Sequence, residues 1–364
     1  MHTYHVLGLM SGSSLDGLDI AYCRFVNHTG SWQFDILQTA VVEFTPEWID
    51  RLKALPQNNA RTLWQTHAAL GNYFGECAAA FIAKHHLSGK VDLIASHGHT
   101  IFHFPPEGFT TQIGDGAAIA ARTGVPVVCD LRTADIAQGG QGTPIVPIGD
   151  KLLFAGHRFC LNIGGIANIS CKKDTGDIVA FDICAANQVL NTLAGMLGKE
   201  YDAGGAIARS GKLNIGLLDK LNKAAFYMQP YPKSLDNSFS RTVVWPVLEQ
   251  ANIPVEEKLH TYTELIAHQV GAHIKAIAVR EGITLSAADK ILVTGGGAFN
   301  SYLIERIQAL SGVTVDVPTD ELVKFKEALV IALMGVLRMR GEVNVLRSVT
   351  GAKKDTTGGA VYLP

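Results

Sequence analysis

Glycine-rich turns at three places in this chain carry the residue types that bind phosphate. The segments are 8–19 (GLMSGSSLDGLD), 162–168 (NIGGIAN) and 294–300 (TGGGAFN). Each follows a short apolar run, so each is predicted to be a strand that leads into a turn. Backbone N–H groups in such a turn form a cradle for an anion, and the hydroxyls of Ser11, Ser13 and Ser14 add donors to the first cradle. Together the turns indicate one phosphate-rich ligand.

Other phosphate and acyl-transfer motifs are missing from the chain. Neither Gly-x-x-x-x-Gly-Lys-Ser/Thr nor Gly-x-Gly-x-x-Gly occurs, so P-loop and Rossmann nucleotide sites are not predicted. A Gly-x-Ser-x-Gly elbow is also absent, which argues against a serine hydrolase. We therefore expect the serines of the first turn to donate hydrogen bonds rather than to attack a substrate.

His97, His99 and His103 form a second cluster with chemical potential, directly after an apolar strand. Their spacing is compatible with metal ligands, but no Glu or Cys completes a recognisable zinc motif. The six cysteines contain no Cys-x-x-Cys pair and lie among apolar neighbours, as expected of reduced core thiols. The sequence therefore predicts neither a zinc site nor a disulfide framework.

Length and composition predict a two-domain protein with a ligand cleft between the domains. The chain has 364 residues, which is longer than a single hydrophobic core usually organises, and 47% of its residues are hydrophobic and 18% charged. The formal net charge is −2 and the sequence has no long basic run, so it predicts no positively charged surface for nucleic acid or for an anionic membrane. The N-terminus lacks the pattern of a signal peptide, and no apolar stretch reaches the roughly 18 residues that span a bilayer. We expect a soluble, cytoplasmic protein.

The turns are positioned by two predicted strand meanders of the same order. The first has strands at residues 5–10, 18–25 and 32–44, and the second at 159–161, 166–171 and 178–181. Apolar residues at three- and four-residue spacing predict helices over 63–86 and 263–280, and short apolar runs at 91–96, 125–130 and 291–294 predict further strands. The sheets are therefore expected to be mixed. We place the domains at 1–135 and 136–364, and the C-terminal tail could return to the first domain.

This arrangement resembles the actin, Hsp70 and sugar kinase superfamily, and most closely the anhydro-N-acetylmuramic acid kinase family. The resemblance covers essentially the whole chain. Besides the first and third glycine turns, the segments that carry it, in order, are 96–103 (SHGHTIFH), 112–116 (QIGDG), 130–137 (DLRTADIA) and 139–147 (GGQGTPIVP). It implies an α/β fold of two RNase H-like, actin-like ATPase domains, whose mixed sheets are flanked by helices and whose active site lies in the interdomain cleft.

The resemblance also implies a reaction. ATP and water act on 1,6-anhydro-N-acetylmuramic acid, open its anhydro bridge and place a phosphate on O6, in peptidoglycan recycling. Water needs a base to attack the anomeric carbon, and Asp182 matches the base of the family. The alternative for Asp182 is the cap of a helix predicted to begin near Cys184. A cytoplasmic homodimer that uses ATP and Mg²⁺ is implied by the family.

Further site residues follow from the same resemblance. ATP is expected to contact the three turns, and Asp16 or Asp19 could hold Mg²⁺, against the alternative of an Asx-turn for Asp16. The residues expected to bind ATP are Gly12, Ser13, Ser14, Leu15, Asp16, Gly17, Leu18, Asp19, Gly164, Gly165, Gly295, Gly296, Gly297 and Asn300. For the third turn, a role in packing alone is the alternative.

The expected sugar contacts are His97, His99, Arg132, Asp135 and Glu327, whereas His103 is expected to be structural. Arg132 could bind the lactyl carboxylate of the sugar, or it could pair with Asp135. Glu327 lies in an apolar helix predicted over 321–340, where it either faces the site or occupies an exposed first turn.

The chain departs from the family pattern in places. Residues 184–187 read CAAN where much of the family has Gly-Pro-Gly-Asn, Ser13 replaces a common threonine, and His99 replaces a frequent glutamine. Alanine restricts the approach of backbone to phosphate, so the first change bears on the nucleotide side of the second domain. The rival classes are another sugar or acyl kinase of the superfamily, and a non-catalytic ATP-driven binding module.

Overall fold

The chain folds into two compact units, which are described separately. A computed structural model describes residues 2–12, 15–236, 238–286 and 288–364. The first unit comprises Met1–Phe154 and Phe325–Pro364, and the second comprises Ala155–Lys324. Residues 136–154, which the sequence analysis assigned to the second domain, thus belong to the first unit, where the ring of Phe154 packs 5.5 Å from that of Phe34.

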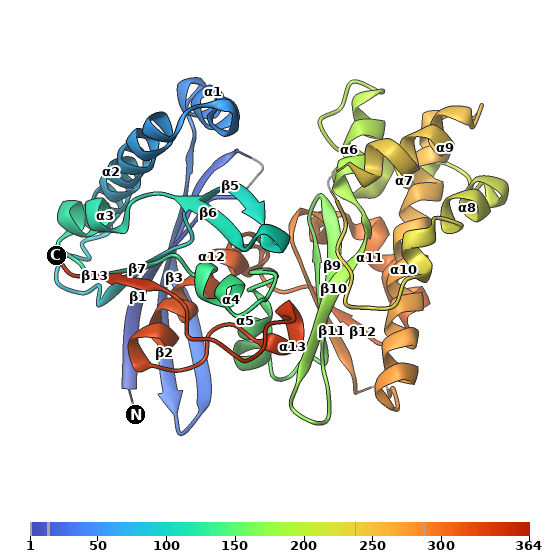
Figure 1. The fold of residues 1–364 in the computed structure, drawn as a ribbon. Helices are drawn as coiled ribbons and strands as arrows, with labels where there is room; N and C mark the ends of the chain where they lie inside the picture. The colour runs from blue at the N-terminus through green and yellow to red at the C-terminus, as the bar shows by residue number, and fades with distance from the viewer. Residues whose placement is uncertain (1, 13–14, 237, 287) are drawn as a thin grey trace. The chain divides into compact units, whose positions relative to one another are not determined.

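The first unit is built on a mixed sheet of six strands among the described residues (Figure 1). The strands are β1 (His2–Met10), β2 (Gly17–His28), β3 (Ser31–Glu43), β4 (Leu93–Ser96), β7 (Val127–Cys129) and β13 (Ala360–Tyr362), in the order β13-β7-β4-β1-β2-β3. β1, β2 and β3 form an antiparallel meander, β4 and β7 continue it in parallel with β1, and β13 pairs antiparallel with β7. The last strand brings the C-terminal segment into this unit.

Helices cover both faces of the first sheet because alternate residues of β1 point to opposite sides. Leu7 and Leu9 share a core with Leu70 and Phe74 of α2 (Ala60–Lys84). Gly8, between them, faces the backbone of α12 (Asp320–Arg340), the helix on the other face. The remaining helices of this unit are α1 (Pro46–Ala54), α3 (Gly116–Thr123), α4 (Thr133–Ala137), α5 (Pro147–Leu153) and α13 (Arg347–Thr350).

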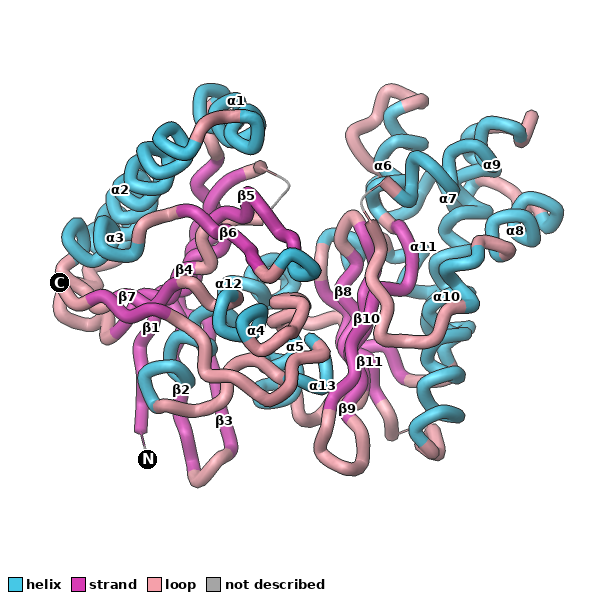
Figure 2. The backbone as a smooth tube through the Cα atoms, viewed as in Figure 1, coloured by secondary structure: helices cyan, strands magenta, loops and turns pink. Residues whose placement is uncertain are grey.

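A two-stranded ribbon, β5 (His99–Phe104) and β6 (Phe109–Ile113), is separate from the large sheet (Figure 2). Two residues, His97 and Gly98, connect β4 to this ribbon, so the histidine cluster lies on that connection and on β5. Because β1 and β4 run parallel as neighbours, the loop after β1 and the loop after β4 lie at the same edge of the large sheet.

The second unit repeats this strand order with different sequence. β8 (Phe159–Ile163), β9 (Ile166–Lys172) and β10 (Ile178–Ala185) form an antiparallel meander. β11 (Lys290–Thr294) lies parallel beside β8, and β12 (Thr314–Asp316) beside β11, which makes a five-stranded sheet of order β10-β9-β8-β11-β12 in the described part of the unit. The order third-second-first-fourth-fifth is thus common to both units, which fits the two related domains implied by the resemblance.

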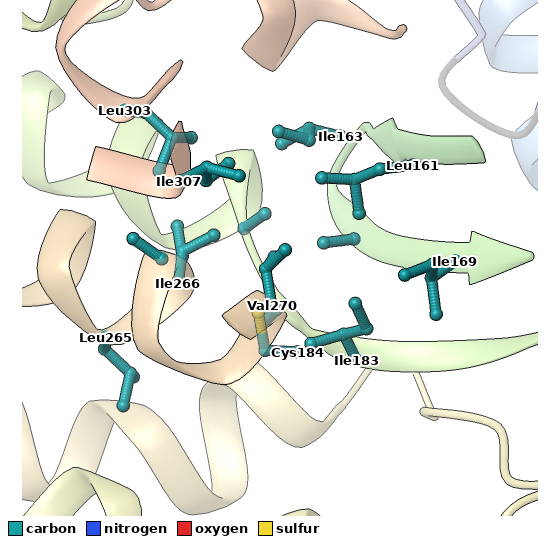
Figure 3. Close-up of a cluster of buried hydrophobic side chains, with 14 of the residues drawn as sticks. Leu161, Ile163, Ile169, Ile183, Cys184, Leu265, Ile266, Val270, Leu303 and Ile307 are labelled. Carbon is teal, nitrogen blue, oxygen red and sulfur yellow. The ribbon is translucent and has the colours of Figure 1, made fainter. Parts of the chain in front are cut away.

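Long helices bury one face of the second sheet. The apolar positions of α10 (Val255–Glu281), among them Ile266 and Val270, pack with Leu161 and Ile163 of β8 and with Ile307 of α11 (Ser301–Ser311), as Figure 3 shows. The shorter helices α6 (Asn187–Gly195), α7 (Ala206–Ser210), α8 (Ile215–Asn222) and α9 (Trp245–Gln250) complete the helical layer. Both units therefore have the α/β architecture with mixed sheets and flanking helices that the sequence predicts.

Two predicted boundaries differ from the structure. The third strand of the second meander continues past residue 181 to Ala185, and the helix after it begins at Asn187 rather than near Cys184. Asp182 consequently lies within β10, at a register shift between Asp182 and Cys184. In the described residues, no helix combines the length and apolar character needed to cross a membrane.

Candidate active site

The first glycine turn joins β1 to β2 in the first unit. Leu15 has a φ of +61°, and its N–H donates to Gly12 O over 3.4 Å. Gly17 has a φ of +157°, and a Cβ there would lie 2.4 Å from Val42 O, so only glycine fits. The side chain of Leu18 belongs to the core, so any contact of Leu18 with a ligand uses its backbone. Ser13 and Ser14 lie outside the described residues.

Asp16 and Asp19 follow this turn, with Asp16 exposed and Asp19 partly buried. Burial, together with the negative charges of Asp16 and Glu327, raises the pKa of Asp19 to about 6. A site of such negative potential favours a cation. The described residues contain no group of three or more His, Cys, Asp or Glu side chains placed to hold a metal. Mg²⁺ nevertheless fits, because it commonly takes only one or two carboxylates and completes its shell with phosphate and water oxygens.

Arg132 and His97 are joined in the first unit by a hydrogen bond. Arg132 Nε donates to His97 Nε2 over 3.0 Å, and Arg132 Nη1 donates to Gly142 O over 2.8 Å. His97 Nδ1 lies 2.9 Å from Gly98 O and must be the protonated nitrogen, since Nε2 accepts. Burial and the charge of Arg132 lower the pKa of His97 to about 3, so the ring is neutral. Both ring nitrogens of His97 therefore have protein partners.

His99 and His103 have different surroundings. The ring of His99 is buried, with Nδ1 3.0 Å from the hydroxyl of Ser11, and burial lowers its pKa to about 4. The Ser11 hydroxyl, expected to add a donor for phosphate, thus links the first glycine turn to the histidine loop. His103 Nδ1 lies 3.0 Å from Thr110 Oγ1 across the β5–β6 ribbon.

The two acidic candidates of the sugar side differ in their contacts. Asp135 is fully buried, with Oδ1 accepting from the hydroxyl of Thr350 over 2.7 Å and Oδ2 from Gly142 N over 2.8 Å. Asp135 thereby fastens the 139–142 loop to α13. It forms no ion pair with Arg132 in the described chain. Glu327 stands in the middle of α12, not in its first turn; burial raises its pKa, and the nearby charge of Arg132 opposes that rise.

The second glycine turn connects β8 to β9. The carbonyl of Gly164 accepts from Asn187 N over 3.1 Å, and the carbonyl of Gly165 accepts from Ala186 N over 2.7 Å. The turn is therefore fastened to the first residues of α6. A Cβ at Gly165 would lie 2.9 Å from Gln188 Cγ, whereas Gly164 has only ordinary contacts around it. An added side chain would therefore find more space at Gly164, while Gly165 is the more solvent-exposed of the pair.

The third turn follows β11 and packs against the second. A Cβ at Gly295 would lie 2.6 Å from Asn162 Oδ1, and one at Gly297 would lie 2.2 Å from Ile163 Cγ2. Packing alone thus requires glycine at these two positions, whereas Gly296 is exposed. Asn300 caps α11, because its Oδ1 accepts from Leu303 N over 3.0 Å. Of this turn, Gly296 has the most room for a ligand.

Asp182 lies in the second unit and does not cap a helix. Its Oδ2 accepts from the hydroxyl of Ser234 over 3.0 Å and from Leu235 N over 2.8 Å. The cap position of α6 is Ala186, without a side-chain cap. Burial raises the pKa of Asp182, while the Leu235 and Ser234 donors oppose the rise. The carboxylate is thus partly withdrawn from water and held through one oxygen.

Residues 184–186, where the chain departs from the family pattern, lie in the core. Cys184, Ala185 and Ala186 are fully buried, and Figure 3 shows the Cys184 sulfur beside Val270 of α10. The buried hydroxyl of Tyr262 donates to Ala185 O over 3.0 Å. The small side chains at 184–186 therefore fill space beneath the strand end.

Sequence reasoning missed one group next to the candidate base, namely Lys233, Ser234 and Leu235. These residues come from a polar stretch without strand or helix periodicity, and 51 residues separate Lys233 from Asp182. Their backbone pairs with β10, since Asp182 N donates to Lys233 O over 3.1 Å. No local sequence signal indicates such a contact.

The repeated strand order, with a glycine turn after the first strand of each unit, defines the actin-like ATPase and sugar kinase class of folds. Within that class, the family model described as anhydro-N-acetylmuramic acid kinase matches residues 4–364. A relative of that name from Saccharophagus degradans is 32% identical and covers 98% of each chain, and one from Shewanella amazonensis is 33% identical with the same coverage. The chain belongs to the anhydro-N-acetylmuramic acid kinase family.

Solved structures show more distant likenesses. Component A of the (R)-2-hydroxyglutaryl-CoA dehydratase of Acidaminococcus fermentans aligns with a TM-score of 0.44 at 14% identity, covering 91% of this chain and 97% of that one. A hexokinase from Schistosoma mansoni aligns with a TM-score of 0.36 at 12% identity, over 91% and 85% of the two chains.

Proposed function

We propose that the protein is a carbohydrate kinase that uses ATP and water to convert 1,6-anhydro-N-acetylmuramic acid into N-acetylmuramic acid 6-phosphate, in peptidoglycan recycling. Family membership over residues 4–364 supports the substrate and the reaction type. The single observation that carries the hydrolytic half is the Asp182 carboxylate, which is partly buried and whose Oδ2 accepts two hydrogen bonds.

The reaction makes two bonds and breaks two. Water adds its oxygen to C1 of the sugar while the C1–O6 bond of the anhydro bridge breaks. O6 takes the γ-phosphoryl group of ATP, and ADP leaves. Asp182 accepts a proton from the attacking water, because neutral water is a poor nucleophile. For phosphoryl transfer itself, a protein contributes mainly the alignment of the reactants and the neutralisation of phosphate charge.

The residues of the first unit are proposed to bind the sugar. The guanidinium of Arg132 suits the lactyl carboxylate, because a planar fork matches a carboxylate. Its bonds to the protein use Nε and Nη1, which orients the remaining nitrogen. His99 and Glu327 are proposed to contact sugar hydroxyls. His97 acts by orienting Arg132, while Asp135 shapes the neighbouring loop.

The nucleotide is proposed to contact the glycine turns through backbone N–H groups. The residues are Gly12, Ser13, Ser14, Leu15, Asp16, Gly17, Leu18 and Asp19 of the first turn, Gly164 and Gly165 of the second, and Gly295, Gly296, Gly297 and Asn300 of the third. Asp16 or Asp19 would hold Mg²⁺, directly or through water. When bound, that ion neutralises phosphate charge.

The proposal is tested by incubating the protein with Mg-ATP and 1,6-anhydro-N-acetylmuramic acid and determining the mass of the product. The expected product is heavier than the sugar by one phosphoryl group (HPO₃) and one water. A gain of the phosphoryl group alone would rule out ring opening. Absence of ADP release would support the non-catalytic binding module, and ADP release only with another sugar would support a different kinase.

Asp182→Asn is the matched variant for this experiment. Asparagine keeps the size of the side chain but cannot accept the proton of the water. We expect product formation to be lost while nucleotide affinity, measured by calorimetry, stays close to that of the unchanged protein. Turnover retained in the variant would remove Asp182 as the base.

A further inference from the structure

A short segment of the second unit lies against the carboxylate of Asp182. The backbone of Lys233 accepts from Asp182 N over 3.1 Å, and Ser234 Oγ and Leu235 N donate to Asp182 Oδ2 over 3.0 and 2.8 Å. Among the described residues, these two bonds are the ones that the carboxylate accepts. Both of these donors reach Oδ2, and within the described part of the chain no hydrogen bond to Oδ1 is found.

Lys233 anchors this segment to the body of the unit. Its Nζ donates to Phe226 O over 3.0 Å, lies 2.9 Å from His273 Nε2, and sits 4.5 Å from the centre of the Phe226 ring. His273 Nδ1 donates to Gln269 O over 2.7 Å, so Nε2 is the nitrogen that accepts from Lys233. The segment is therefore held from two elements, the turn at residues 226–227 and α10.

The arrangement matters for a base because a hydrogen bond donated to a carboxylate favours its ionised form. Burial raises the pKa of Asp182, and the donors from Leu235 and Ser234 work against that rise. Losing the Ser234 hydroxyl removes one of them while the main-chain donor remains. Side-chain orientation would then also be less constrained.

We propose that residues 233–235 position Asp182 for proton abstraction, with Ser234 as the positioning residue that occupies Oδ2 and presents Oδ1 to the water. Lys233 is the anchor that keeps Ser234 in place. This inference rests on the proposed function, because it takes Asp182 to be the base.

The test is Ser234→Ala, with kcat measured as a function of pH. We expect kcat near neutral pH to fall roughly tenfold, and the acidic limb of the profile to move to higher pH, with the KM for ATP unchanged. Ser234→Thr keeps the hydroxyl and should restore both properties. Ser238→Ala is the control, because Ser238 lies in the same stretch but its N–H donates to Asp236 and not to Asp182.

The difference in the acidic limb between Ser234→Ala and Ser234→Thr reports on Asp182, because both variants keep the other titratable groups around it. Burial raises the pKa of Cys184, the neighbour on β10, to about 12, and lowers that of His273 on α10 to about 4. Burial also lowers the pKa of Lys233 to about 8, which affects only the alkaline side. His273 contributes equally in all variants, and Tyr227 keeps its proton throughout this range, since burial raises its pKa.

A second measurement needs no turnover. Carbon-13 NMR of labelled aspartate carboxyls, with the Asp182 signal assigned from Asp182→Asn, should show a higher pKa in Ser234→Ala than in the unchanged protein. If the unchanged protein forms no product, the proposed function fails, and this titration still decides on the positioning. An Asp182 titration and an acidic limb that both stay in place, with only a lower melting temperature, would overturn the inference.

Discussion

At the scale of single residues, hydrogen bonds within the first unit hold the side chain of Arg132 in one orientation. Its guanidinium donates to the neutral ring of His97 and to a main-chain carbonyl, and burial lowers its pKa to about 10 while Glu327 opposes this. Two bonds fix the plane of the fork. His97, which the sequence predicts to contact the sugar, thus binds Arg132 in the folded protein.

Arg132→Lys should therefore weaken sugar binding more than nucleotide binding. Lysine keeps the charge but lacks the planar fork and the Nε donor. We expect the KM for the sugar to rise roughly 10- to 100-fold, the range of one or two hydrogen bonds to a charged group, with the KM for ATP nearly constant. His97→Ala should change the same constant in the same direction. His103→Ala is the control, since His103 contacts Thr110 within the ribbon. An effect confined to ATP would contradict this assignment.

At the scale of elements, close backbone approach explains several glycines that look like ligand residues in the sequence. Gly8 begins the first glycine-rich segment, yet it lies in β1 and faces α12, where a Cβ would be 1.9 Å from Ala328 O. Gly295 and Gly297 have the same relation to the end of β8. Such glycines hold the strands and helices that carry the loops at the required spacing.

Gly8→Ala should destabilise the first unit. The added methyl group must displace the backbone of α12, and overpacking of this kind typically costs about 1–3 kcal/mol. Urea unfolding followed by tryptophan fluorescence measures the change, because three of the four tryptophans (Trp32, Trp48 and Trp64) lie in this unit. Gly195→Ala, at a helical position with open space around it, should be neutral or slightly stabilising. Equal stability of Gly8→Ala and the unchanged protein would refute the packing argument.

At the scale of the whole molecule, one strand order is built twice from different residues. The meander β1–β3 and the meander β8–β10 each continue into parallel strands, and each places a glycine turn after its first strand. Sequence identity between the halves is not needed for this, because the order depends on alternating burial and on short turns. The repeat explains why phosphate-type turns recur along the chain.

The homodimer and the cytoplasmic location implied by the family remain proposals at this scale. Light scattering coupled to size-exclusion chromatography should give twice the chain mass of 39.0 kDa. A mass of 39.0 kDa that persists as the concentration rises would contradict the dimer. Fractionation of the source cells tests the location.

Most strands and long helices could be predicted from the sequence, because their signals are local. Short apolar runs followed by turn residues mark β1 and β2, periodicity of three to four marks α2 and α10, and a glycine pair marks the turn at Gly164. The end of β10 was predicted too early, since the strand continues through Asp182 by pairing with β9 and not by any pattern of its own.

By itself, the sequence determined the α/β class, the glycine turns and the family, because these depend on residue types at short spacing. Only the tertiary structure decided what each candidate touches. In the folded chain, Arg132 donates a hydrogen bond to His97, and Ser234 donates one to Asp182. Both carboxylate oxygens of Asp135 accept hydrogen bonds from the protein. The physical reason is that hydrogen bonds and burial between residues far apart in the chain exist only after folding, and they decide which atoms remain for a ligand.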